Sequence, residues 1–534
     1  MFYYLFRTLI PLLFTLICLN LNYAGETGKA CPVNLLEVDY QSFDVNNIRS
    51  WITNNGSIFH NPYGGSGFEW PKDSGSFAIY GAGLWLGAKV DGELRVTIAE
   101  YASEFGPGNI NPRTHLAENP MDSIFKVYKI GEGGNLADYQ NWPGQLGAPV
   151  DSLGHPLLIG DQTLWTVFND ADTNGHVNMG SLPLGVELQL TVFGWHIYNT
   201  EIDNVVLMHY LIINRGVNNL DSVFFAIFCD PDLGDSGDDF VGCDTTTSLG
   251  YCYNSSDFDE DYGEHPPAVG IQILQGALVP DTSDSGYFLG WKRRNSRNLP
   301  MTAFIWYNSN NANNGDPHNT AEVYHFMQGR WRDGQRITYG GIGTNPSNPP
   351  TNYMVSGDPE SGEGWLDSSP ADRRLFLSSG PFDMLPGESQ EVVIAALIER
   401  GSSNLNSATR LKEQAAFLKH FYKEYGYQLF RGSPYTPPPP PDTTLVIERL
   451  GLFQNYPIPF NSSTTLKYQL PISRMVHLEI FNSAGQRIAT LVNEPQEPDE
   501  YEVVWDASSR ASGIYFVRLR VAQYTFTKKL LLLK

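Results

Sequence analysis

Apolar and polar residues alternate along most of the chain, the pattern of β-strands with one buried face. The runs "NVVLMHYLIINRG", "DSVFFAIFCD" and "ESQEVVIAALIERG" predict strands, and "NRGVNNLD" separates the first two as a turn. "FAIYGAGLWLGAKVDGELRV" predicts two strands joined at Asp91-Gly92, a strong hairpin signal. One further segment places four apolar residues on one side: Val186, Leu188, Leu190 and Val192.

These strands predict antiparallel β-sandwich architecture for residues 25–432, as one large sandwich or as two that divide near residues 150–158. One segment follows a helical period instead, which Asn406 or Ser407 can begin and Gly426 can end. Its apolar residues share one face: Leu411, Ala415, Leu418, Tyr422 and Tyr425. We therefore predict one helix near the C-terminal end of this region.

A run of prolines divides the chain. Residues 433–444 read "SPYTPPPPPDTT", and consecutive prolines fix φ and remove backbone donors, which predicts an extended linker. Residues 445–534 then alternate again in "VHLEI" and "YEVVW", and about seven short strands predict a small Ig-like sandwich. The predicted fold class is therefore mainly β, with a large antiparallel sandwich region and its C-terminal helix before the small sandwich.

The first residues have the pattern of a secretory signal peptide. Arg7 provides a positive charge, residues 9–19 are mostly apolar, and Ala24 is a small residue at a suitable cleavage point. A lipoprotein signal is the alternative because Cys18 and Cys31 are present, but neither follows the small, uncharged residues that such a signal needs. We predict that residues 1–24 direct export.

The net charge of −23 disfavours one class of partner. An acidic chain repels phosphate backbones, so we expect no nucleic acid. Cysteine is rare after residue 24, where Cys31, Cys229, Cys243 and Cys252 remain. In an exported chain these thiols can form disulfides, with Cys243 and Cys252 near enough to bridge a hairpin, or they can be buried and free.

The C-terminal segment carries "FQNYPIPFNSSTTLKYQLP", "GQRIATLV", "WDASSRASGIYFVRL" and "KKLLLLK" in this order. Residues 450–534 thereby resemble the type A C-terminal sorting domain of the type IX (Por) secretion system. The usual pattern has Asn-Pro-Phe-Asn after Tyr-Pro, and here Ile458 replaces the first Asn. The residues that carry the resemblance are Asn455, Tyr456, Pro457, Pro459, Phe460, Asn461, Trp505, Asp506, Gly513, Tyr515, Lys528 and Lys529.

The resemblance implies export by the general secretory route and then passage across the outer membrane, to the cell surface or the medium. It implies two partners, the type IX translocon and a sortase-like peptidase. The peptidase removes the domain and couples the cargo to surface lipopolysaccharide, or releases it. The central region is more distantly similar to large exported proteins that carry such tails, through "NNIRSWITNNGSI", "SGFEWPKDSG" and "AGLWLGAKVDGELRV". That likeness implies no activity.

Two acidic stretches suggest calcium, which prefers six to eight hard oxygen ligands. In "NDADTNGHVN", Asp170, Asp172 and Asn174 alternate, although an Asx-rich turn explains the same residues. The second stretch is "CDPDLGDSGDDFVGCD". No Lys or Arg occurs between Arg215 and Lys292, so a cation or solvent must offset the repulsion among its carboxylates. The predicted Ca²⁺ ligands there are Asp230, Asp232, Asp235, Asp238 and Asp239.

No catalytic motif selects an activity. Seven tryptophans can stack on sugar rings or fill the core: Trp51, Trp70, Trp85, Trp165, Trp195, Trp306 and Trp331. Four carboxylates can serve glycoside hydrolysis, although their spacing selects none: Glu69, Glu100, Glu187 and Asp170. The leading hypothesis is a non-enzymatic surface adhesin or glycan-binding protein. The alternative is a surface polysaccharide hydrolase that uses a carboxylate pair.

Overall fold

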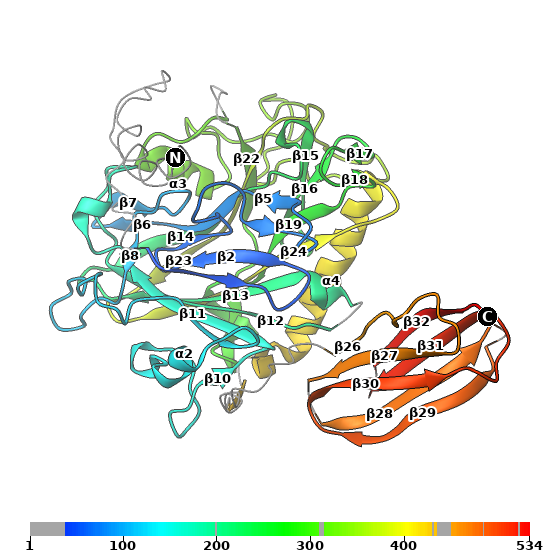
Figure 1. Ribbon diagram of the computed structural model, residues 1–534. Coiled ribbons are helices and arrows are strands. Elements are labelled where there is room, and N and C mark those ends of the chain that lie inside the picture. The colour runs from blue at the N-terminus through cyan, green and yellow to red at the C-terminus, as the bar shows by residue number, and fades with distance from the viewer. Residues whose placement is uncertain are drawn as a thin grey trace, which may run out of the picture. The chain divides into compact units, whose positions relative to one another are not determined.

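The computed structural model describes residues 38–197, 200–308, 314–429, 432–434, 450–471, 473–483, 485–521 and 524–534. The chain divides into two compact units, Met1–Thr436 and Pro437–Lys534 (Figure 1). The predicted signal peptide, Cys31 and residues 435–444 of the predicted linker lie outside the described residues.

Two large antiparallel sheets form the first unit. The ten-stranded sheet has the order β22 (Ala303–Tyr307), β23 (Arg374–Met384), β14 (Leu220–Asp230), β6 (Gly81–Val90), β3 (Ser57–Ile58), β2 (Arg49–Thr53), β4 (Phe68–Glu69) and β5 (Phe77–Ile79), with β1 (Tyr40–Phe43) beside β2 and β7 (Glu93–Thr97) beside β6. The nine-stranded sheet has the order β15 (Asp239–Asp244), β16 (Leu249–Asn254), β19 (Ala268–Gln275), β24 (Ser389–Glu399), β13 (Val205–Asn214), β12 (Val186–Gly194), β11 (Gln162–Asn169) and β8 (Gly106–Pro107), with β9 (Tyr128–Gly131) beside β11.

Smaller elements complete this unit. Three strand pairs stand apart from the large sheets: β10 (Leu157–Leu158) with β25 (Ser433–Pro434), β17 (Phe258–Asp259) with β18 (Gly263–Glu264), and β20 (Leu278–Phe288) with β21 (Trp291–Asn298). The described α-helices are α2 (Leu136–Gln140), α3 (Thr320–Met327) and α4 (Asn404–Leu429). None of these described helices is both long and apolar enough to cross a membrane.

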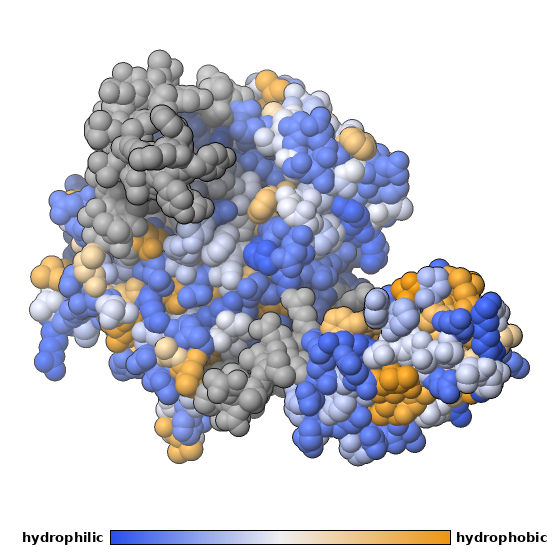
Figure 2. Space-filling model, viewed as in Figure 1, coloured by the Kyte–Doolittle hydropathy of each residue, from blue (hydrophilic) through white to orange (hydrophobic). Residues whose placement is uncertain are grey.

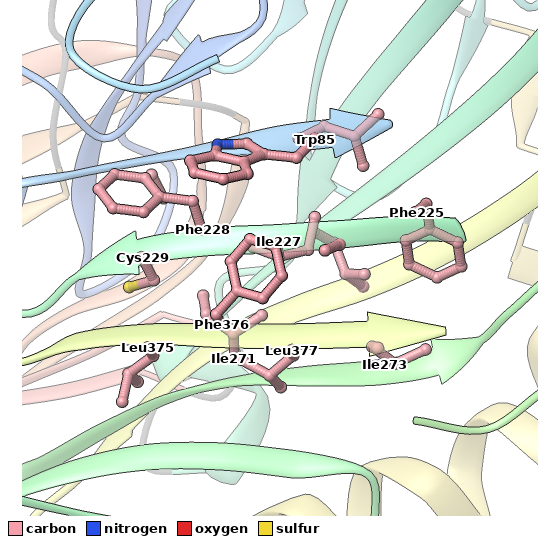
Figure 3. Packing of buried hydrophobic residues seen from close by; sticks show 14 of the residues in the cluster. Trp85, Phe225, Ile227, Phe228, Cys229, Ile271, Ile273, Leu375, Phe376 and Leu377 are labelled. Carbon is pink, nitrogen blue, oxygen red and sulfur yellow. The ribbon is translucent and has the colours of Figure 1, made fainter. Parts of the chain in front are cut away.

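The two large sheets share one hydrophobic core. Trp85 on β6 is fully buried, with its ring centre 5.9 Å from that of Phe228 on β14 and 5.0 Å from that of Phe376 on β23. Ile271 on β19 of the other sheet belongs to the same buried cluster (Figure 3). The predicted core face of β12 also lies here: Val186, Leu188, Leu190 and Val192. The prediction of a mainly β fold with large antiparallel sheets is confirmed.

Helix α4 covers the outer face of the nine-stranded sheet, against β16, β19 and β24 (Figure 1). Leu411, Ala415 and Leu418 are buried there with Phe193 and Leu207 of the sheet. This second layer explains why the central strands are apolar on both faces. The predicted helix is confirmed, but its ends differ from the prediction. It begins at Asn404, before Asn406 and Ser407, and it continues past Gly426 to Leu429, and Tyr425 is 51% exposed.

The second unit contains two smaller antiparallel sheets. One has the order β26 (Gly451–Leu452), β27 (Ser463–Leu470) and β30 (Asp499–Asp506), and the other has the order β29 (Arg487–Gln496), β28 (Arg474–Asn482), β31 (Gly513–Val521) and β32 (Tyr524–Leu532). Leu466 from the first sheet and Leu478 and Leu519 from the second belong to one buried cluster. Alternating side chains on each strand supply this core, as the sequence predicts.

The three cysteines among the described residues, Cys229, Cys243 and Cys252, are buried and free. The hairpin β15–β16 places Cys243 opposite Gly250 and Cys252 opposite Val241. Because the two thiols are not cross-strand neighbours, the predicted hairpin disulfide does not form. Burial raises the pKa of the Cys243 and Cys252 thiols well above its usual value, which keeps them protonated.

Candidate functional site

The first predicted calcium loop has the contacts of an Asx-rich turn. The carboxylate of Asp170 is fully buried, and it accepts hydrogen bonds from Thr97 Oγ1 and from the backbone N–H groups of Leu184 and Val186, each at 2.7 Å, and of Gly185 at 2.9 Å. Asp172 Oδ1 accepts from the backbone N–H of Asn174 at 2.9 Å. These contacts occupy both oxygens of Asp170 and one of Asp172, so they favour the Asx-rich turn over calcium in this loop.

The second stretch separates its acidic residues into two groups. Asp235 caps a short 3-10 helix by accepting from the Gly237 N–H at 2.9 Å. Asp238 accepts from Asn254 Nδ2 at 2.8 Å, and Asp239 is fully buried and accepts from the Leu233 N–H at 3.3 Å. Asp235 and Asp238 therefore serve local structure, whereas Asp239 Oδ1 is buried and accepts no hydrogen bond from a described residue.

Asp230 and Asp232 join a different residue. One carboxylate oxygen from each of Asp230, Asp232 and Asp372 lies within 4.8 Å of the other two. Among the described residues, this is the one group of three potential metal ligands that lie so close together. The pairing of β14 with β23 causes this approach, because Cys229 lies opposite Leu375 and Asp230 therefore lies beside Arg374. Sequence reasoning missed Asp372, because this pairing joins distant segments and the adjacent "DRR" indicates local charge compensation.

One arginine and one tyrosine hold this carboxylate cluster, which consists of Asp230, Asp232 and Asp372. Arg374 Nε lies 3.9 Å from Asp230 Oδ1, and its Nη2 lies 3.6 Å from Asp372 Oδ2. The Tyr101 hydroxyl donates to Asp230 Oδ2. Asp230 Oδ1 and Asp372 Oδ1 are buried and accept no hydrogen bond from any described residue. One guanidinium therefore faces three carboxylates.

Burial raises the pKa of the acidic groups at this place. The pKa of Asp232 rises to about 7 and that of Asp230 to about 6, in each case mainly through desolvation, with Arg374 acting in the opposite direction. Desolvation and the charge of Asp316 raise the pKa of Glu100 to about 8. Carboxyl groups with raised pKa values can bind a cation or exchange a proton near neutral pH.

A second candidate site is a cavity of about 340 Å³ that three tryptophans line, Trp306 on β22 and Trp331 and Trp365 on the segment between α3 and β23. We call it the tryptophan cavity. Trp331 Nε1 donates to the Gly343 carbonyl at 3.1 Å, and Trp365 Nε1 donates to the Gly341 carbonyl at 3.0 Å. These bonds fix two indole rings as apolar walls.

Charged and polar groups complete the tryptophan cavity. Arg373 donates to Asp367 from Nε at 3.1 Å and from Nη2 at 3.2 Å, and both side chains are almost fully buried. The Arg373 guanidinium also lies 3.8 Å from the centre of the Trp306 ring. Trp306 Nε1 and Asn308 Oδ1 are buried without a hydrogen-bond partner among the described residues. Among the buried atoms of the described lining, these two are a donor and an acceptor available to a ligand.

The other predicted residues have mostly structural contacts. Trp85 and Trp165 are core residues, with at most 1% exposure. Glu69 accepts from Arg49 Nη1 at 3.0 Å, and Glu187 accepts from Arg215 Nη2 at 3.1 Å. Trp306 and Trp331 line the cavity together with Trp365, which sequence reasoning missed because "EGWLD" shows no strand or helix period. Glu100 alone of the four proposed catalytic acids lies near the carboxylate cluster.

The sorting motif divides into core and surface residues in the second unit. Asn455 is buried and donates from Nδ2 to the Pro457 carbonyl at 2.9 Å and to Thr464 Oγ1 at 2.8 Å. Phe460 and Trp505 are buried, with ring centres 5.6 Å apart. These residues fix the shape of the motif. The exposed motif residues are Tyr456, Pro457, Pro459, Asn461, Asp506 and Lys529, and Tyr515 and Lys528 are half-buried.

Backbone hydrogen bonds join the two ends of the second unit. The Phe460 N–H donates to the Leu531 carbonyl at 3.0 Å, and the Leu533 N–H donates to the Phe460 carbonyl at 2.9 Å. Around this junction Ile458 is 42% and Leu533 is 51% exposed, and Figure 2 shows hydrophobic patches on the visible face of this unit. Exposed apolar patches of this kind are typical of surfaces that contact other proteins.

Comparison with known families identifies this unit. The family described as "Secretion system C-terminal sorting domain" matches residues 454–533. The protein is a type IX secretion cargo with a C-terminal sorting domain. It is therefore secreted across the outer membrane to the cell surface or the extracellular space, and this domain interacts with the type IX secretion machinery.

Other comparisons add no activity. No curated protein matches the chain. A polysaccharide lyase structure is 9% identical with a TM-score of 0.26, and the match covers 92% of this chain but only 47% of the lyase. The adhesin domain of Epf from Streptococcus pyogenes is 8% identical with a TM-score of 0.13, covering 64% of this chain and 84% of that domain. These TM-scores are too low to indicate a shared fold.

Proposed function

We propose that the first unit is a non-catalytic glycan-binding protein that the sorting domain delivers to the cell surface, and that the tryptophan cavity holds a sugar residue. The tryptophan cavity itself carries this proposal. Its volume of about 340 Å³ lies in the range of small-molecule sites. Sugar C–H groups pack on indole rings, and hydroxyl groups need both donors and acceptors.

The polar groups of the cavity favour a neutral sugar. Arg373 and Asp367 already neutralise each other in a two-bond ion pair. The free groups are Trp306 Nε1, a donor, and Asn308 Oδ1, an acceptor. Sugar hydroxyl groups can accept from the first and donate to the second, which would satisfy two buried atoms that are otherwise costly to desolvate.

Binding by the full-length protein tests this proposal. A glycan array identifies a ligand, and titration then compares wild type with Trp306→Ala. We expect the variant to weaken binding about tenfold or more, because it removes both the ring and the donor. The matched control is Phe258→Ala, which removes an aromatic ring that is 58% exposed and does not line the cavity. Equal affinity of wild type and Trp306→Ala, with an unchanged melting temperature, contradicts the proposal.

The raised pKa values of Glu100, Asp230 and Asp232 favour a second function, hydrolysis of a surface polysaccharide. A general acid must hold its proton near neutral pH, and the pKa of about 8 for Glu100 and of about 7 for Asp232 meet this requirement, whereas Asp230, with a pKa of about 6, is mostly ionised there. A reducing-sugar assay on the full-length protein separates the two functions. We expect no release of sugar. Release that is lost in Asp232→Asn would replace the binding proposal with a hydrolase.

A further inference from the structure

A second cavity, separate from the tryptophan cavity, has a cationic lining. It has a volume of about 460 Å³ and lies between β19, the hairpin β20–β21 and helix α4. Arg297 from β21 and Lys419 and Lys423 from α4 line it, together with Asp284, the acidic residue of the lining. We call it the cationic cavity.

The strand beside this cavity adds further positive charge. Lys292, Arg293 and Arg294 are consecutive exposed residues of β21, and none forms an ion pair with a described residue. Of the hairpin cations, Arg297 is paired, with its Nε 3.3 Å from Asp281 Oδ2. The chain has 35 Lys and Arg residues against 58 Asp and Glu. A cluster of unpaired cations is therefore a positive patch on an otherwise acidic protein.

The lysines of α4 also lack a carboxylate partner. Lys419 Nζ donates to the Thr246 carbonyl, and no ion pair joins Lys419 or Lys423 to a described residue. Desolvation lowers the pKa of the Lys419 ammonium, the charge of Asp244 acts in the opposite direction, and the charge of Lys423 lowers it further. Like charges that converge on a concave surface repel one another unless an anion lies between them.

We propose that the cationic cavity binds a carboxylate or phosphate group of an anionic glycan. Two aromatic residues, Tyr287 and Tyr422, line the same cavity, and Trp291 is exposed on the neighbouring strand. Rings stack on sugars while ammonium and guanidinium groups bind the charged substituents. This site is separate from the neutral-sugar site of the tryptophan cavity and does not depend on it.

The geometry favours a glycan over two other anionic partners. The cations that line the cavity lie on a concave surface, which admits a single substituent but not a planar membrane. The net charge of −23 repels the closely spaced phosphates of nucleic acids. Exposed charges on β21 also keep an edge strand from pairing with another chain, and that role alone would require no particular ligand.

Binding of polygalacturonate to the full-length protein tests the proposal, with neutral dextran, phosphatidylglycerol vesicles and a DNA oligonucleotide as competing probes. We expect polygalacturonate to bind and added NaCl to weaken it. Arg297→Ser/Lys419→Ser/Lys423→Ser, which removes the three cations of the lining, should lower the affinity about tenfold or more. Lys89→Ser/Arg113→Ser/Arg336→Ser removes the same charge from exposed positions elsewhere and should leave the affinity unchanged.

Three results would overturn the proposal. They are no binding of polygalacturonate, equal losses in the two triple variants, and stronger binding of vesicles or DNA than of polygalacturonate. Equal losses would assign the effect to net charge. Trp306→Ala should bind polygalacturonate as wild type does, so this test and the test of the tryptophan cavity can fail independently.

Discussion

Trp505→Ala is expected to abolish appearance of the protein outside the cell and to leave it in the periplasm. Trp505 is 3% exposed, and its ring packs against Phe460 at 5.6 Å and against Tyr515 at 5.3 Å between ring centres. Removal of a buried Trp side chain costs about 3–5 kcal/mol. The second unit is small, and a small domain has a stability near the low end of about 5–15 kcal/mol, so the variant should lose most of its stability.

The variant therefore removes the folded domain that the secretion machinery recognises. Immunodetection on intact cells and in fractionated envelopes measures the effect. Deletion of residues 450–534 should give the same result without any question of residual folding. Val504→Ala is the matched control, because Val504 is the preceding residue on β30 and is 64% exposed. Normal surface display of the deletion variant would disprove the sorting role.

Local sequence patterns predict the strands, whereas the pairing of distant strands brings the residues of each site together. Asp91 and Gly92 both have positive φ, 51° and 85°, in the tight turn between β6 and β7, as the hairpin signal predicts. Gly426 in contrast lies within α4, where continued helical hydrogen bonding outweighs the low helix propensity of one glycine. Periodicity identifies a face but not the end of an element.

The candidate sites show the same limit. Asp230 and Asp232 were predicted as ligands from local acid density, but their neighbour Asp372 is brought to them only by the pairing of β14 with β23. Trp365 likewise reaches the tryptophan cavity through an irregular segment with no period to read. Local density of a residue type therefore finds part of a site, and sheet topology supplies the rest.

The stability of the first unit should depend on pH through the carboxylate cluster. Burial raises the pKa of Asp232 to about 7, whereas in the unfolded chain this carboxyl group ionises near pH 4. As the pH rises above about 4 the unfolded state loses its proton first, so the free energy of unfolding falls until about pH 7 and is then constant.

Asp232→Asn removes this penalty because the amide stays neutral. We expect the variant to match wild type near pH 4 and to melt about 3 °C higher at pH 8. Differential scanning calorimetry between pH 4 and pH 8 measures the difference in melting temperature between the variant and wild type. The other titrating groups affect both proteins equally and cancel in this difference. Asp235→Asn is the matched control, since its exposed side chain caps a turn outside the cluster. A constant difference between Asp232→Asn and wild type at every pH would contradict this prediction.

Calcium offers a second way to relieve the same repulsion. A divalent cation between Asp230, Asp232 and Asp372 compensates the charge that Arg374 leaves unbalanced. The sequence-based prediction of calcium therefore requires millimolar Ca²⁺ to raise the melting temperature of wild type at pH 8, with a smaller rise near pH 4, where protons occupy the carboxyl groups. Asp372→Asn should lose that rise, and Asp235→Asn should keep it. A pH effect without a calcium effect would show that protons alone neutralise the cluster.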